Sequence, residues 1–223
     1  MDGNDLETQP EDLNTSNTSE TTTMQLLAEL KDIWRNERFA PELLPHHVDL
    51  VDCLLEQVRV MEGNVGKARG KEPYRCHVHK MELNRIRFML SNYLRCRLEK
   101  LELFTTHYRQ LSAEQQEHFL SPAELTFLNN FADKTDELLT NSVAPYLPTG
   151  MPVLDAWKKN PARPKLDSFV FVQPKEVLEG VILDAGTQDG REEEIVTLEE
   201  GGQYLLRYSS VREHVMANRV LLM

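Results

Sequence analysis

The apolar residues between Tyr74 and Tyr108 recur at spacings of three and four and predict one long helix. At about 1.5 Å per residue, this helix would be roughly 50 Å long. One apolar face holds Leu83, Ile86, Leu90, Tyr93, Leu94, Leu101, Phe104 and Tyr108. The opposite face holds Val78, Met81, Phe88, Met89, Cys96 and Leu103. Because both faces must be buried, either this chain's other helices cover them or one face or end packs on another polypeptide.

A helical pattern extends from Thr22 to about Tyr146 and predicts three further helices. A threonine of 21–23 caps the first helix, whose apolar face holds Met24, Leu27, Leu30 and Trp34. The second begins near Val48 and is ended by Gly63, Gly66 and Gly70, with Val51, Leu54, Leu55, Val58, Met61 and Val65 turned inward. Ser121 opens the last with a capping box and a proline at the first helical position. Its apolar set is Leu125, Leu128, Phe131, Leu138, Leu139 and Val143.

Alternating apolar residues in the C-terminal part predict short strands. The expected strands are 168–172, 177–183, 194–198, 203–208 and 219–222. Asp189-Gly190 and Gly201-Gly202 supply turns, and residues 210–213 fit a short helix before the last strand. A unit of about 60 residues is marginally stable alone, so we expect it to lean on a neighbour.

These patterns divide the chain into four parts. Residues 1–21 are acidic and poor in apolar side chains, and we expect them to be disordered. Residues 22–146 form a helical bundle, 147–164 a proline-rich linker with Trp157 as its one large anchor, and 165–223 a small β-rich domain. The fold class is therefore mainly α, with a helical bundle first and a β-rich domain second.

Composition narrows the class of protein. Of the 223 residues, 40% are apolar, which is enough to form a hydrophobic core. No apolar run approaches the roughly 18 residues needed to span a bilayer, so we expect no membrane segment. Three well-separated cysteines suit a reducing compartment, the nucleus or cytoplasm. The net charge of −11 argues against a general nucleic-acid coat.

Motifs that carry chemistry are nearly absent from the sequence. There is no phosphate-binding Gly-rich loop, no nucleophile elbow and no zinc-protease helix. The cluster Cys76-His77-Val78-His79 contains zinc-ligand types but lacks a second ligand pair, and His46-His47 reads as a loop. We expect no enzyme activity, metal or cofactor, while a small hydrolase with an unrecognised site stays a minor alternative.

Basic residues along the long helix raise a second functional possibility. Arg75, Lys80, Arg85, Arg87, Arg95, Arg97, Lys100 and Arg109 outnumber Glu82, Glu99 and Glu102, so the helix 74–108 could act as a nucleic-acid-binding module. Arg97, however, points into the apolar stripe. A guanidinium there requires a carboxylate partner, which suggests an ion pair at an interface.

Three stretches of the chain resemble the SLD-five family (subunit four) of the eukaryotic GINS replication complex. They are Asn36–Leu44 (NERFAPELL), Arg85–Leu98 (RIRFMLSNYLRCRL) and Leu166–Val172 (LDSFVFV). The endings Tyr204–Tyr208 (YLLRY) and Val220–Leu222 also match. The resemblance covers roughly residues 22–223 in order and leaves out the acidic N-terminus.

The resemblance implies a heterotetramer of four related subunits and a non-catalytic role in the nucleus. Such a complex joins the MCM helicase to its RecJ-like accessory factor and helps tether the polymerase at the replication fork; whether this subunit touches DNA stays open. We expect the following residues at an interface or in inner packing: Phe88, Tyr93, Arg97, Leu101, Phe104, Phe169, Phe171, Tyr204, Tyr208 and Leu221.

Overall fold

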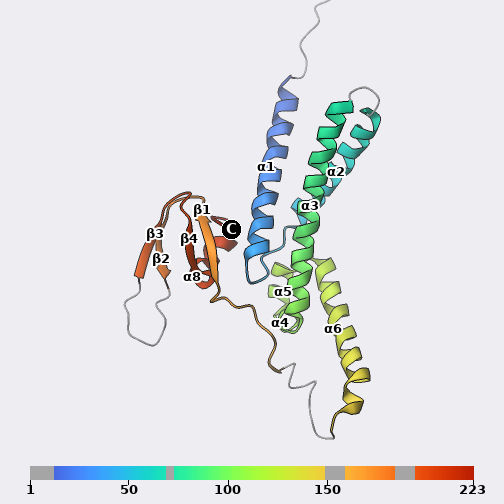
Figure 1. Ribbon diagram of the computed structural model, residues 1–223, viewed down its shortest axis with the longest axis vertical. Helices are drawn as coiled ribbons and strands as arrows, with labels where there is room; N and C mark the ends of the chain where they lie inside the picture. Colours follow the sequence, from blue (N-terminus) through green and yellow to red (C-terminus); the bar gives the residue numbers. More distant parts are fainter. Residues whose placement is uncertain (1–12, 69–72, 149–158, 184–193) are drawn as a thin grey trace, which may run out of the picture.

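The computed structural model describes residues 13–68, 73–148, 159–183 and 194–223 (Figure 1). The helical part consists of α1 (Leu13–Phe39), α2 (Val48–Ala68), α3 (Pro73–Leu103), α4 (Thr105–Arg109), α5 (Ala113–Phe119), α6 (Pro122–Ser142) and the 3₁₀ turn η1 (Ala144–Tyr146). The C-terminal part consists of β1 (Phe169–Pro174), β2 (Leu178–Leu183), β3 (Glu194–Leu198), β4 (Tyr204–Arg207), α8 (Tyr208–Met216) and β5 (Val220–Leu222). The predicted fold class, a helical bundle followed by a small β-rich domain, is confirmed.

Two hydrophobic cores hold the helical domain together. In the first, α1, α2 and α3 bury a cluster that includes Leu30, Leu54 and Leu90. In the second, the end of α3 meets α4 and α6 through Leu101, Tyr108, Leu120 and Leu128, with Leu43 from the segment after α1. In Figure 1, α2 and α3 run side by side as a hairpin and α6 extends away from the lower part of α3.

The β-rich domain is a three-stranded antiparallel sheet in the order β4-β1-β5, accompanied by the antiparallel pair β2-β3. Inward residues of β1, such as Val170 and Val172, pack with Val211 and Val215 of α8. The same core includes Ala40 and Leu44, which follow α1. The helical domain therefore contributes directly to the core of the β-rich domain.

The long predicted helix 74–108 is wrong only at its C-terminal end. The helix α3 ends at Leu103, and Phe104 leaves helical geometry with φ −115° and ψ 28° before α4 begins. After this break, the Tyr108 hydroxyl accepts a hydrogen bond of 2.9 Å from the backbone N–H of Leu43. Periodicity missed the break because helical spacing continues across it.

The N-terminal helix also differs from the prediction. Helix α1 is already formed at Leu13, so the expected disorder over 1–21 is wrong for 13–21, and the expected threonine cap lies inside the helix. Adding residues to an established helix costs little compared with nucleation. Residues 1–12 lie outside the described part of the chain.

Several local predictions agree with the structure. The capping box at Ser121 is present, and α2 begins at Val48. The turn at Gly201 has a φ of +73°, which suits glycine. Helix α8 begins at Tyr208, two residues before the predicted helix. Asp189-Gly190 and Trp157 lie outside the described residues.

Candidate assembly interface

A fully buried arginine organises the helical domain. Arg97, on α3, is only 1% exposed. Its guanidinium binds Glu124 at both carboxylate oxygens, through Nε at 2.7 Å and Nη2 at 3.0 Å, and its Nη1 donates to Glu37 at 3.1 Å. The carbonyls of Leu44 and Phe119 accept the remaining N–H groups, at 2.8 and 2.6 Å. All five donors of the side chain are thus used.

The electrostatics of this cluster favour its charged form. Burial opposes the charge of Arg97, but the hydrogen bonds that it donates to Glu124 and the charge of Glu37 raise the Arg97 pKa above its ordinary value. Burial also opposes the charge of Glu124, yet its bonds to Arg97 lower the Glu124 pKa. The interface ion pair expected for Arg97 is therefore corrected: its carboxylate partners belong to its own chain.

A second buried cation holds the segment that leaves α1. The Nζ of Lys100 donates to the Glu37 carboxylate at 2.6 Å and to the carbonyl of Glu42 at 2.8 Å. Burial lowers the pKa of Lys100, although the charge of Glu37 works against this. Lys100 and Arg97 together fix the backbone of residues 37–44 against α3.

That segment is also where the β-rich domain docks. Both oxygens of Glu42 bind Arg212 on α8, at 2.6 and 2.8 Å, and one accepts the Tyr208 hydroxyl at 2.9 Å. Burial and the charge of Glu42 raise the pKa of Tyr208. The Asn36 side chain donates to the carbonyl of Val220 at 3.1 Å and accepts from the amide of Leu222 at 2.9 Å.

The β-rich domain therefore leans on this chain's own helical domain. Sequence reasoning did not single out Asn36 and Glu42 individually. A signal for both was present, because they fall within the stretch Asn36–Leu44 that resembles the SLD-five family.

One face of the sheet is apolar and remains at the surface. On β1, Phe169 and Phe171 alternate with the inward valines and are 65% and 56% exposed. Leu205 pairs with Phe171 and is 55% exposed, and Leu221 pairs with Gln173 on the same face. The guanidinium of Arg207 lies 5.9 Å from the Phe169 ring centre. We call Phe169, Phe171, Leu205 and Leu221 the outer sheet face.

A second apolar surface runs along α3. Of the predicted opposite face, Met89 is buried and Cys96 is half-buried, while Val78, Met81, Phe88 and Leu103 are exposed. The Phe88 ring packs nearly perpendicular to the Trp34 ring of α1, with ring centres 6.3 Å apart. The exposed residues Val78, Met81, Phe88 and Leu103 form what we call the α3 stripe.

The other predicted site residues lie inside the chain's own packing or at its edge. Tyr93 and Leu101 are buried in the two helical cores, and burial raises the pKa of Tyr93 to about 12. Phe104 is partly buried against the second core. Tyr208 is fully buried, and Tyr204 packs at the edge of the β-rich core.

The basic stripe proposed for nucleic acid is not continuous. Arg97 and Lys100 are buried in the networks above. Arg85 pairs with Glu82 at 2.9 Å, Arg87 with Glu62, and Arg109 with Asp133 at 2.9 Å. Two of the eight basic residues are therefore buried and three others are paired with carboxylates, which weakens that alternative.

The described residues offer neither a metal-binding cluster nor a membrane-spanning helix. Over 13–68, 73–148, 159–183 and 194–223, no group of three His, Cys, Asp or Glu side chains is placed to hold a metal ion. Within the same ranges, no helix combines the length and the apolar character that crossing a membrane requires.

Comparisons with known proteins cover both domains. Residues 8–143 match the family model described as the GINS complex protein helical bundle domain, and residues 164–223 match the C-terminus of DNA replication complex GINS protein SLD5. The chain is 36% identical over 204 residues to the human DNA replication complex GINS protein SLD5, covering 90% of each chain. It is 30% identical to the Arabidopsis thaliana protein of the same name, covering 86% of this chain and 88% of the relative. The chain belongs to the SLD5 family of DNA replication complex GINS proteins.

Proposed function

We propose that this chain is a non-catalytic scaffold subunit of a GINS complex and that it acts in DNA replication in the nucleus. Its partners are three other GINS subunits. Membership of the SLD5 family supports this assignment. The structure adds two apolar surfaces, the outer sheet face and the α3 stripe, which are suited to protein contacts.

The outer sheet face is the observation that carries the proposal. Two phenylalanines and a leucine, all more than half exposed, stand side by side on paired strands. Contiguous exposed apolar side chains of this kind mark sites that another surface covers, and aromatic residues are enriched at the centres of protein interfaces. The nearby Arg207 supplies a polar rim.

The docking of the two domains explains how one chain could organise several others. Asn36 and Glu42 hold the β-rich domain on the helical domain. The outer sheet face and the α3 stripe therefore keep a fixed position and orientation relative to each other. A subunit that binds one partner on each surface would then set the geometry between those partners.

Within the replication machinery, the assembled complex joins the MCM helicase to its RecJ-like accessory factor, contacts the replicative polymerase and associates with chromatin. This part of the proposal rests on the family resemblance. The chain positions its partners within that assembly. The buried Arg97 and Lys100 networks supply the stiffness that such a role requires.

Co-expression with the three sister subunits tests the assembly surface. Phe171→Asp places a charge at the centre of the outer sheet face, and we expect loss of most of the four-subunit complex in size-exclusion chromatography. Ile182→Asp is the matched control, because Ile182 is an exposed apolar residue on β2, outside that face. Normal assembly of Phe171→Asp, or equal loss in both variants, would count against the proposal.

A further inference from the structure

A row of three cations lies along the C-terminal half of α1. Lys31, Arg35 and Arg38 follow one another at spacings of four and three, which places them on one side of the helix. Lys31 and Arg38 are exposed, and Arg35 is half-buried. We call these three residues the basic row. Within residues 13–68, 73–148, 159–183 and 194–223, none of the three is paired with a carboxylate.

The carboxylates closest to the basic row in sequence already have partners within the chain. Asp32 pairs with Lys175 at 2.8 Å. Glu37 is buried and bonded to Arg97 and Lys100. The row therefore leaves three positive charges uncompensated on this side of α1, although the whole chain has a net charge of −11. Such a local excess complements a partner surface that carries carboxylates.

Aromatic side chains hold Arg38 in place beside the α3 stripe. The guanidinium carbon of Arg38 lies 5.9 Å from the Trp34 ring centre and 5.7 Å from that of Phe39. The Trp34 ring is fixed in turn, because its Nε1 donates a hydrogen bond of 2.7 Å to Asn92 and Phe88 of the α3 stripe packs against it. A side chain that is already held loses less conformational entropy on binding, and tryptophan and arginine are enriched among the residues that dominate binding energies.

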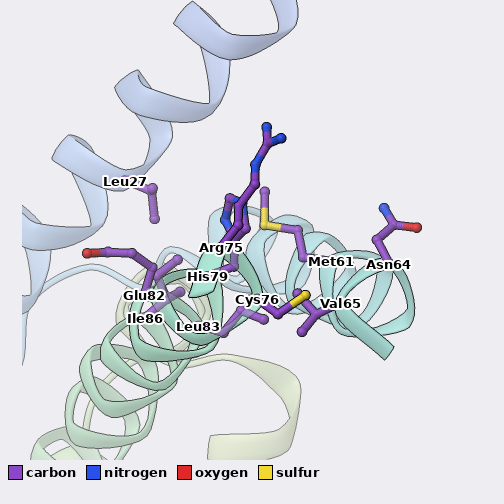
Figure 2. Close-up of a pocket in the computed structure, with 10 residues that line it drawn as sticks. All are labelled: Leu27, Met61, Asn64, Val65, Arg75, Cys76, His79, Glu82, Leu83 and Ile86. Atoms are coloured by element: carbon purple, nitrogen blue, oxygen red, sulfur yellow. The ribbon is translucent and has the colours of Figure 1, made fainter. Parts of the chain in front are cut away.

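The basic row differs from the groove that lies between α1 and the α2-α3 hairpin (Figure 2). That groove has a volume of about 570 Å³ and begins one turn before Lys31, at Leu27. One arginine, Arg75, and one carboxylate, Glu82, line it, so its charges do not select a partner. The row, by contrast, carries charge of one sign and adjoins the α3 stripe through Trp34 and Phe88.

We propose that the sister subunit that covers the α3 stripe carries carboxylates that pair with the basic row, with Arg38 as the central contact. This inference rests on the proposed function, because it takes the α3 stripe to be an assembly surface. The stripe supplies the apolar centre of the interface, and the row supplies its charged rim. Complementary charges at a rim exclude wrong partners and speed association, so the row selects one subunit among the three.

Two other acidic ligands fit the row less well. Proteins whose DNA binding depends steeply on salt make about six to ten phosphate contacts, whereas the row offers three cations. The chain's own acidic residues 1–12 join α1 at Leu13, which precedes Lys31 by about 27 Å along the helix. At about 3.4 Å per residue, only residues 1–5 could reach the row even when fully extended.

Zero-length cross-linking of the assembled complex tests the pairing. A carbodiimide joins a lysine amine to a carboxylate only where the two groups touch. In the complex that contains the Arg38→Lys variant, we expect cross-links from positions 31 and 38 to aspartates or glutamates of one sister subunit, identified by mass spectrometry. Lys67, an exposed cation on α2, should not link to the same carboxylates. Cross-links from 31 and 38 only to this chain's own residues, or none at all, would overturn the proposal.

Charge reversal measures what the row contributes to assembly. When the four subunits are co-expressed, Arg38→Glu should lower the yield of the complex by about tenfold. Lys67→Glu is the matched control, because it makes the same change of charge at an exposed site outside the row and the stripe, and its yield should stay normal. A normal yield for Arg38→Glu, or an equal loss in Lys67→Glu, would overturn the proposal.

The unmodified chain separates failure of this inference from failure of the proposed function. If the unmodified chain forms no complex with the sister subunits, the scaffold function itself is contradicted. If the unmodified chain and Arg38→Glu both assemble normally, only the pairing at the basic row is overturned. Binding of labelled duplex DNA by the complex that is lost in Arg38→Glu would also overturn it, since the row would then face phosphates.

Discussion

At the scale of single residues, Arg97 joins three parts of the helical domain that are far apart in sequence. Its carboxylate partners Glu124 and Glu37 lie 27 and 60 positions away. The sequence predicted that Arg97 needs a carboxylate, since its position falls within an apolar stripe. It could not identify the partner, because helical spacing describes only neighbours within a few turns.

The first prediction concerns the loss of this guanidinium. Arg97→Ala leaves the Glu124 carboxylate buried without its cation and leaves Glu37 with Lys100 alone, so we expect the free energy of unfolding to fall by about 3–5 kcal/mol. Arg109→Ala breaks a surface pair with Asp133 and should cost about 1 kcal/mol or less. Urea denaturation of the full-length chain measures both. Similar losses in the two variants would contradict the role given to the Arg97 network.

The second prediction concerns pH and Glu124. Arg97 lowers the pKa of Glu124 in the folded chain, so the folded state binds this proton less readily than the unfolded state. The resulting stability is present above the ordinary glutamate pKa of about 4.3 and is lost as the pH falls through the lowered folded value.

We therefore expect Glu124→Gln to be less stable than the unmodified chain at neutral pH, and the difference to shrink in acid. Denaturation midpoints measured from pH 7 to pH 3 provide the comparison. A constant difference across this range would show that the charge of Glu124 does not stabilise the fold.

At the scale of elements, local patterns predicted much of the structure. Strand alternation placed all five strands within two residues, and the Ser121 capping box marked the start of α6. The break at Phe104 and the helix α4 were missed, because the tertiary contact of Tyr108 with Leu43 lies outside any local pattern. The docking of β5 on α1 was missed for a similar reason: Asn36 and Leu222 are 186 positions apart. Helix α5 was missed although Ser112 and Gln115 form a capping box at its start.

The third prediction concerns this docking. Glu42→Ala removes the acceptor for Tyr208 and Arg212, so α8 and β5 should exchange their amide hydrogens faster while α2 stays unchanged. Asp133→Ala is the control, because it removes only a surface contact with Arg109 inside the helical domain. Hydrogen exchange followed by mass spectrometry reports each element separately. Unchanged exchange in α8 and β5 would mean that other contacts hold the domains together.

At the scale of the whole molecule, the chain consists of two small domains that pack against each other. The outer sheet face and the α3 stripe remain exposed. The sequence indicated two apolar faces on α3 and a β-rich domain too small to be stable alone. It could not tell which face the chain itself covers, because both faces have the same spacing. The structure shows that the Leu90 face is buried except at Leu94, whereas the α3 stripe remains at the surface.

Native mass spectrometry of the tagged full-length chain, purified gently from dividing cells of its own organism, tests the central claim most directly. The account predicts a one-to-one assembly with three other small subunits. A stable lone monomer that binds labelled DNA with a steep salt dependence would contradict it.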